Sequence, residues 1–285
     1  MALKTLYTLT KPGIVYGNAL TAAAGFILGA HGLWPLSRFV ATIGGIGLII
    51  ACGCVLNNYI DRGIDAKMKR TQKRALVRGG ISGLAALLYA MCLGLAGTAL
   101  LGFLTNVLAL SVALSGLFLY VVVYGVAKRA TVHGTVIGSL SGAVPPVVGY
   151  TAATGRLDAG ALLLFAILVC WQMPHFYAIA MFRNDDYAAA SIPVLPVVKG
   201  MQTTKRYIMV YILAFLFAVS SLTVFGYTGY SYLIIMGSIG VYWAWRGLRG
   251  YRQPDDVRWA RTMFFISLTA LPALPIALLL NVWLP

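Results

Sequence analysis

The chain has 285 residues, of which 60% are hydrophobic and only 10% are charged, and its formal net charge is +15. Soluble globular proteins carry roughly 25% charged residues, so this composition excludes an ordinary soluble domain. The apolar residues fall in blocks of about 20, the length that a helix needs to cross a bilayer, and we predict an all-α, polytopic integral membrane protein rather than a membrane barrel.

Hydrophobic segments of this length occur nine times along the chain. Two of them, "TAAAGFILGA" in the first and "GTVIGSLSGAVPPVVG" in the fifth, are rich in small residues that allow helices to pack closely in lipid. We expect the segments to form one transmembrane domain, residues 1–285. The predicted spans are 13–33, 38–58, 82–102, 106–126, 134–153, 159–181, 207–226, 230–247 and 263–283.

The distribution of lysine and arginine predicts the orientation in the membrane. If the N-terminus is cytoplasmic, 20 of the 22 basic residues lie in cytoplasmic segments, and only Arg38 and Arg156 lie outside. Such a bias is typical of the positive-inside rule. It predicts a cytoplasmic N-terminus and an external C-terminus, and it accounts for the net charge without nucleic acid as a partner. We expect the chain to lie in the bacterial inner membrane.

Acidic residues are scarce: there are seven, and all are aspartate. The two longest cytoplasmic segments, 59–81 and 182–206, follow the second and sixth spans. Each begins with aspartate and continues with basic residues. This correspondence suggests an internal four-helix repeat, spans 1–4 and 5–8.

The first of these segments overlaps with "LNNYIDRGIDAKMKRTQKRALVRGG", residues 56–80. Asn57, Asp61 and Asp65 are spaced i, i+4, i+8, so on a helix they form one stripe. Side-chain oxygens of this kind suit Mg²⁺. This ion is usually coordinated by only one or two carboxylates and often also by phosphate oxygens. An alternative is that Asp61 and Asp65 only pair with basic neighbours. Seven such neighbours follow: Arg62, Lys67, Lys69, Arg70, Lys73, Arg74 and Arg78.

The second segment overlaps with "WQMPHFYAIAMFRNDDYAAASIPVLPVVKG", residues 171–200. We expect Asp186 to share the ion site of the first segment and Asp185 to be a solvated neighbour. His175 lies within the sixth span. Two interpretations of it stay open: a hydrogen bond to another helix, or a functional role within the membrane.

Four segments of the sequence resemble characteristic segments of a known family and occur in the same order along the chain. They are "LTKPGIV", "NNYIDRGIDAKMKRT", "VYGVAKRATVHGTVIGSLSGAVPPVVGY" and "WQMPHFYAIAMFRNDDYAAASIPVLPVV". Together they resemble the protoheme IX farnesyltransferases (haem O synthases), a branch of the intramembrane prenyltransferases that act on aromatic acceptors. The resemblance runs from about residue 8 to 200. It implies a bundle of nine helices around a central cavity that is open laterally to lipid.

The resemblance also implies an activity and a set of site residues. The family transfers a farnesyl group from farnesyl diphosphate to a vinyl carbon of haem b, and Mg²⁺ holds the diphosphate. The expected metal ligands are Asn57, Asp61, Asp65 and Asp186, of which the three aspartates are also expected to be catalytic. The expected diphosphate-binding residues are Arg70, Arg74, Tyr124, Lys128, Arg129, Arg183 and Lys199, and His175 is expected to bind haem.

This chain departs from the superfamily pattern at two points. The first motif of the superfamily reads N-D-x-x-D-x-x-x-D, and here Asn58 stands in place of the first aspartate. The second motif usually has more carboxylates than Asp186 and its neighbour. We therefore expect one firmly held metal ion and a second held only loosely.

Two other functions stay open from the sequence. A quinone-pathway prenyltransferase would use the same ionisation chemistry on an aromatic ring, although the Asn57–Asn58 pair and the "WQMPH" block argue against it. A transporter of haem or of an anionic lipid would also fit many spans and a basic cytoplasmic surface. The expected partners are farnesyl diphosphate, haem b and membrane lipid, with association to a haem A synthase or terminal oxidase left open.

Overall fold

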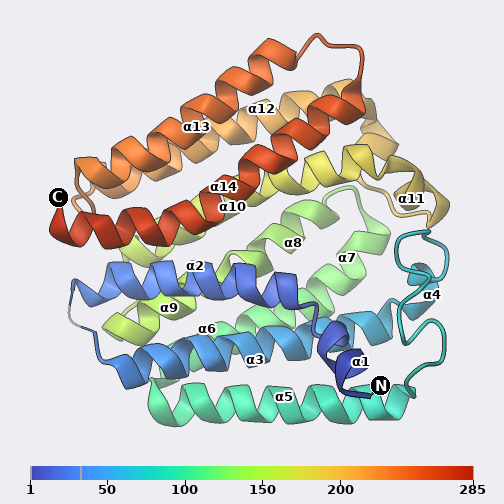
Figure 1. Cartoon of the computed structure of the whole chain (residues 1–285), viewed down its shortest axis with the longest axis horizontal. Helices are drawn as coiled ribbons and strands as arrows, with labels where there is room; N and C mark the ends of the chain where they lie inside the picture. The colour runs from blue at the N-terminus through green and yellow to red at the C-terminus, as the bar shows by residue number, and fades with distance from the viewer. Residues whose placement is uncertain (1, 33, 285) are drawn as a thin grey trace.

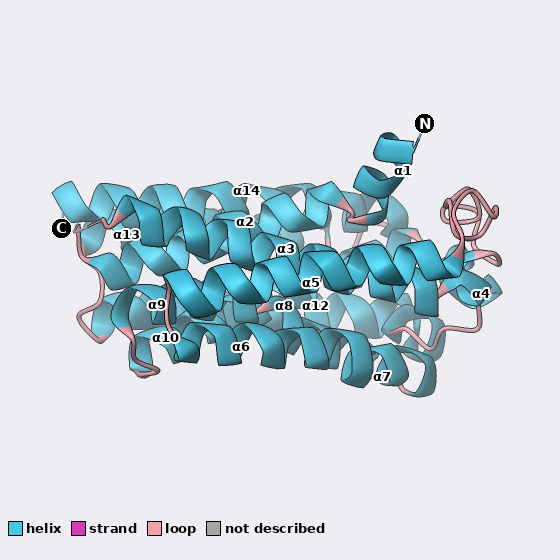
Figure 2. Cartoon of the chain, turned by 90° about the horizontal axis from the view of Figure 1, so that it is seen from below, coloured by secondary structure: helices cyan, strands magenta, loops and turns pink. Residues whose placement is uncertain are grey.

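The computed structural model describes residues 2–32 and 34–284, and within these ranges the chain is helical with no strand. The long helices run side by side along one axis and form a single bundle (Figures 1 and 2). The predicted all-α membrane fold is thereby confirmed. The helices are α1 (Ala2–Leu9), α2 (Pro12–Ala30), α3 (Leu36–Ile60), α4 (Arg62–Asp65), α5 (Gly83–Leu104), α6 (Val107–Phe118), α7 (Tyr124–Ala130), α8 (Gly134–Gly142), α9 (Val144–Thr154), α10 (Ala159–Phe182), α11 (Asn184–Ala189), α12 (Leu195–Val224), α13 (Tyr230–Gly250) and α14 (Asp256–Trp283).

Among the described residues, eight helical segments are long and apolar enough to cross a membrane. The predicted count of nine is therefore not confirmed. The segment predicted at 230–247 does form a helix, α13, which packs against α12 and α14 (Figure 1). Its tyrosines, tryptophans and arginines lower its mean hydropathy, and this is why it is not among the eight. The eight are Pro12–Ala30, Leu36–Ile60, Gly83–Leu104, Val107–Ala130, Gly134–Thr154, Ala159–Phe182, Leu195–Val224 and Asp256–Trp283.

Three of these segments contain a local break. A π-helical turn, Leu119–Val123, joins α6 to α7. The fifth segment is divided at Ala143 into α8 and α9, and Pro145 lies in the first turn of α9, where a missing N–H costs nothing. Within α12, Gly200 has φ 79°, so the helix begins with a separate turn before its membrane-crossing part.

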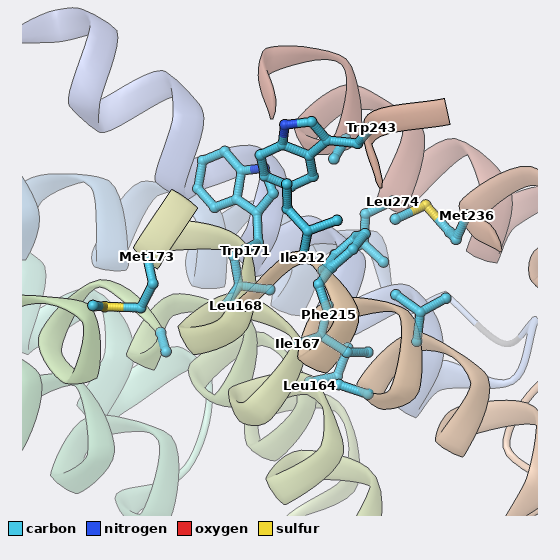
Figure 3. Packing of buried hydrophobic residues seen from close by; sticks show 14 of the residues in the cluster. Leu164, Ile167, Leu168, Trp171, Met173, Ile212, Phe215, Met236, Trp243 and Leu274 are labelled. Carbon is cyan, nitrogen blue, oxygen red and sulfur yellow. The ribbon is translucent and has the colours of Figure 1, made fainter. Parts of the chain in front are cut away.

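The hydrophobic core is arranged around α10. One cluster joins α10 to α12, α13 and α14, and Figure 3 shows Leu164, Ile167 and Leu168 of α10 close to Ile212 and Phe215 of α12. A second cluster joins α2, α3, α6 and α9. The two clusters hold the helices that surround a central cavity.

Candidate active site

The central cavity has a volume of about 570 Å³ and is walled mainly by α2, α3, α6, α8 and α10, with smaller contributions from α7, α9 and α14. One end is polar and charged, and includes the side chains of α4 and of the loop after it. The remainder is mostly apolar, with side chains such as Ile46, Ile49 and Leu168. The volume falls within the range of about 300–1,000 Å³ that is usual for small-molecule sites.

The predicted oxygen stripe lies at the charged end of this cavity. Helix α3 ends at Ile60, yet the backbone N–H of Asp61 donates to the carbonyl of Asn57 over 2.9 Å, and that of Asp65 donates to Asp61 over 2.8 Å. The helical repeat therefore continues across the boundary between α3 and α4. As a result Asn57, Asp61 and Asp65 all line the cavity, and Asp65 is only 2% exposed.

Each carboxylate of the stripe contacts a cation. Asp61 contacts the Nζ of Lys128, and its Oδ1 is 2.9 Å from the guanidinium of Arg129. Asp65 Oδ2 lies 2.5 Å from Arg74. The partners of Asp61 come from α7, far along the chain, and not from the basic run that follows it. The charged end is therefore assembled by the tertiary fold.

The donor set at this end fits Mg²⁺. Asn57, Asp61 and Asp65 offer hard oxygen atoms, and cations from three other parts of the chain gather around them. Within the described residues no cluster of three or more His, Cys or Asp side chains is close enough to enclose a metal by itself. Mg²⁺ commonly binds through one or two carboxylates together with substrate phosphates, so a site of this kind is completed by an anionic substrate.

The structure brings some of the predicted diphosphate-binding residues together and leaves others apart. Arg70, Arg74, Tyr124 and Lys128 line the cavity. The Lys128 ammonium lies 5.1 Å from the centre of the Tyr124 ring. Four predicted site residues are not part of the cavity wall: Arg129, Arg183, Asp186 and Lys199.

Each of these four has a definite place. Arg129 reaches Asp61 from outside the cavity, whereas Arg183 lies against the ring of Phe182 at 5.7 Å. Asp186 Oδ1 accepts a hydrogen bond from the backbone N–H of Lys69 over 3.2 Å. That bond fixes α11 beside the loop that carries Arg70. Lys199 is exposed.

Three cavity residues were missed by the sequence reasoning. Lys11 adopts a left-handed backbone (φ 52°) and donates from Nζ to Asn57 Oδ1 over 3.0 Å. Burial lowers the pKa of Lys11 to about 8. The feature of the sequence that could have pointed to Lys11 is the "LTKPGIV" block, which contains it. Tyr120 stacks on Tyr124 with 5.9 Å between ring centres. Tyr187 follows the aspartate pair, and burial raises its pKa.

His175 lies in the apolar part of the cavity wall. Its Nδ1 is 2.8 Å from Ser267 Oγ on α14, so the helix–helix hydrogen bond considered from the sequence is present. Ser267 Oγ donates its own hydrogen to the carbonyl of Phe264 over 2.5 Å. The hydroxyl therefore accepts from Nδ1–H of His175, which leaves the Nε2 lone pair unused by this bond. The ring stacks on Trp171 at 5.0 Å.

Comparison with known proteins identifies the family. The family model for the UbiA prenyltransferases matches residues 18–269. The chain belongs to the UbiA prenyltransferase family. Within it the chain groups with the protoheme IX farnesyltransferases: it is 50% identical to that of Serratia proteamaculans over 96% of this chain and 93% of the relative. It is 48% identical to the protoheme IX farnesyltransferase of Citrobacter koseri over 100% of this chain and 97% of the relative.

Solved structures share the fold of the chain. A digeranylgeranylglyceryl phosphate synthase superposes with a TM-score of 0.80 at 15% identity, covering 98% of both chains. A UbiA homologue from Archaeoglobus fulgidus was solved with GPP and Mg²⁺ bound. It superposes with a TM-score of 0.70 at 14% identity, covering 96% of this chain and 99% of the homologue. The chain is thus a prenyltransferase and a multi-pass membrane protein.

Proposed function

We propose that this prenyltransferase moves the farnesyl group of farnesyl diphosphate to a vinyl group of haem b, which yields haem O and diphosphate, with Mg²⁺ as cofactor. The strongest support is that one cavity contains both an acid–cation cluster and an apolar compartment walled by His175 and Trp171. The charged end suits a diphosphate and the apolar part suits an isoprenoid beside a large aromatic acceptor. The name shared by the relatives supports the same pair of substrates.

The oxygen stripe is proposed to hold Mg²⁺ through Asn57, Asp61 and Asp65. Asp186 is proposed as a further ligand at the rim, because its bond to Lys69 keeps it beside the basic loop. When bound, Mg²⁺ supplies positive charge to the diphosphate oxygens and so makes the diphosphate a better leaving group. The Archaeoglobus homologue was solved with GPP and Mg²⁺, which supports Mg²⁺ as the ion that accompanies a prenyl diphosphate in this family.

The cations around the stripe are proposed to bind the diphosphate and to stabilise the charge that it gains. The C1–O bond breaks, and its electron pair leaves with the diphosphate. Fixed positive charges beside a leaving group lower the barrier because they need not reorganise. Arg70, Arg74, Lys128 and Lys11 line this end of the cavity, and Arg129, Arg183 and Lys199 are proposed to steer the diphosphate toward it.

The allylic cation is proposed to lie between the stacked rings of Tyr120 and Tyr124 and the apolar wall, where water is excluded. The π electrons of the haem vinyl group then form the new bond to C1. The positive charge then lies on the vinyl carbon next to the macrocycle. Water adds to this carbon through its oxygen and loses a proton, which leaves a hydroxyl group. The product carries a hydroxyethylfarnesyl substituent.

The orientation in the membrane is proposed from the charge distribution. In both views the N-terminal helix α1 and the end of α14 lie at opposite ends of the bundle (Figures 1 and 2). This arrangement supports an odd number of crossings, with α13 included. The cytoplasmic side would then be the end with α4 and α11, where most of the lysine and arginine residues lie.

A reconstitution assay tests the proposed reaction. Purified protein in lipid nanodiscs is supplied with farnesyl diphosphate, haem b and Mg²⁺, and the haem is analysed by mass spectrometry. We expect a gain of one farnesyl group plus one water per haem, together with release of one diphosphate. A parallel assay supplies a hydroxybenzoate in place of haem, and product on it alone would favour the quinone-pathway alternative. In sealed proteoliposomes, haem movement across the bilayer without diphosphate release would favour a transporter.

The place of haem is tested at the hydrogen bond between His175 and Ser267. If His175 Nε2 ligates the haem iron, Ser267→Ala removes the group that fixes the ring, and loss of such a partner commonly weakens metal binding by about 10- to 100-fold. We expect His175→Ala to abolish the spectral change on haem titration and Ser267→Ala to weaken binding by at least tenfold.

Ser220→Ala is the matched control for this experiment, because Ser220 also bonds a carbonyl within its own helix, on α12, and does not line the cavity. Its haem titration should match that of the unmodified protein. Unchanged spectra for both His175→Ala and Ser267→Ala would remove His175 from the haem site, while farnesyl transfer itself is scored separately by mass.

A further inference from the structure

A second cavity, of about 290 Å³, lies where α13 ends and α14 begins, and we call it the α13–α14 cavity. It shares no lining residue with the central cavity. The loop that borders it lies at the same end of the bundle as α4 and α11 (Figure 1). Its lining residues are Arg246, Arg249, Gly250, Gln253, Trp259 and Thr262.

A buried lysine on α12 fixes the floor of this cavity. Lys205 is 1% exposed, and its Nζ lies 2.6 Å from Asp256 Oδ1 and 3.1 Å from the carbonyl of Tyr251. The same ammonium lies 5.2 Å from the ring of Trp259, whose Nε1 donates to the carbonyl of Gly247 over 3.0 Å. The loop and both helix ends are therefore held in place before any ligand arrives.

The cavity is lined by two arginines that no carboxylate pairs with in the described part of the chain. Arg246 and Arg249 are three residues apart on α13, so they share a face. Among the described residues neither forms an ion pair. The nearby acids are engaged elsewhere: Asp256 pairs with Lys205, and Asp255 accepts from the backbone N–H of Arg258 over 2.9 Å. Two guanidinium groups around a small hollow form a site for an anion with several oxygen atoms.

Aromatic side chains place this anion site at the depth of the lipid headgroups. The guanidinium of Arg249 lies 5.4 Å from the ring of Trp245, and that of Arg246 lies 6.0 Å from the ring of Tyr242. Both rings are nearly half exposed, at 48% and 46%. Exposed tyrosine and tryptophan gather at the membrane–water interface. Basic pockets between helices at that level bind anionic headgroups.

We propose that the α13–α14 cavity binds the phosphate group of an anionic phospholipid, with Arg246 and Arg249 as its ligands. A lipid is favoured over a free phosphate ion because the aromatic rim and the exposed Leu248, 67% accessible, provide a surface for the acyl chains. The site does not depend on the reaction in the central cavity. It gives a function to the buried Lys205–Asp256 pair, which fixes the loop beside the cavity and has no part in the proposed reaction.

The experiment is native mass spectrometry of the purified, delipidated protein titrated with phosphatidylglycerol or with phosphatidylcholine. We expect phosphatidylglycerol to bind more tightly, and the double change Arg246→Gln, Arg249→Gln to weaken that binding by about thirtyfold. The control is Arg258→Gln, Arg261→Gln, which removes the same charge from the start of α14 at positions outside the cavity wall. Its affinity for phosphatidylglycerol should be unchanged.

Other outcomes overturn the proposal. Equal loss of binding in both double variants would mean that net charge alone attracts the lipid. Displacement of phosphatidylglycerol by millimolar inorganic phosphate would identify a site for the free ion. If the double variant does not fold, the single change at the exposed Arg249 replaces it. An expected weakening of about fivefold supports the site, and unchanged affinity contradicts it.

Discussion

Replacing Asp65 by asparagine is expected to lower kcat/KM for farnesyl transfer by about 10²- to 10³-fold. Asparagine keeps the size of the side chain and removes its charge. Asp65 is almost fully buried and contacts Arg74. Its carboxylate is proposed both to offer an oxygen to the metal and to hold a cation at the diphosphate. Asp61→Asn should have an effect of the same order, because Asp61 holds two cations from α7. The measurement is haem O formation at saturating Mg²⁺.

A loss of rate must be separated from a loss of folding. Asp158→Asn is the matched control, since Asp158 caps α10 at the other end of the bundle and asparagine caps a helix equally well. Each variant is also checked for a monodisperse peak in size-exclusion chromatography. A folded Asp65→Asn variant that makes haem O at a near-normal rate would contradict the assignment of the oxygen stripe.

Sequence spacing was sufficient to predict which residues of α3 and α4 face the same way. Asn57, Asp61 and Asp65 line one cavity because the i, i+4 backbone hydrogen bonds continue through the residue at which α3 ends. Small-residue segments correctly predicted where helices approach closely. The all-α membrane fold followed from composition. These features depend on periodicity along a single helix, and a sequence displays that periodicity directly.

Features that depend on the direction of a side chain between helices were not predictable in the same way. Lys11 was counted only as a charge for orientation, yet its left-handed backbone turns it toward Asn57. The π-helical turn before Tyr124 has no clear sequence signal. Arg183, Asp186 and Lys199 come from the second polar segment of the sequence, and all three lie outside the cavity wall. The ninth span was counted from α13, whose aromatic and basic residues make it less apolar than its neighbours.

Gly149→Ala is expected to destabilise the protein strongly, although the change adds one methyl group. A Cβ at Gly149 would lie 1.9 Å from the carbonyl oxygen of Ala22, and one at Gly25 would lie 1.8 Å from that of Pro146. Helices α2 and α9 are therefore in backbone contact, as the small residues of both segments predict. Overpacking costs about 1–3 kcal/mol where side chains can move, and here the obstacle is backbone. We expect the apparent Tm to fall by roughly 10 °C.

Gly237→Ala is the matched control and should act in the opposite direction. Gly237 lies inside α13, and a Cβ there would meet nothing within 4 Å. Alanine favours a helix interior over glycine by about 1 kcal/mol, so this variant should be as stable as the unmodified protein or more so. Thermal unfolding of both variants in the same detergent decides the matter. If Gly149→Ala matched Gly237→Ala, the close contact between α2 and α9 would not exist in the folded protein, and the central cavity that these helices help to wall would have a different shape.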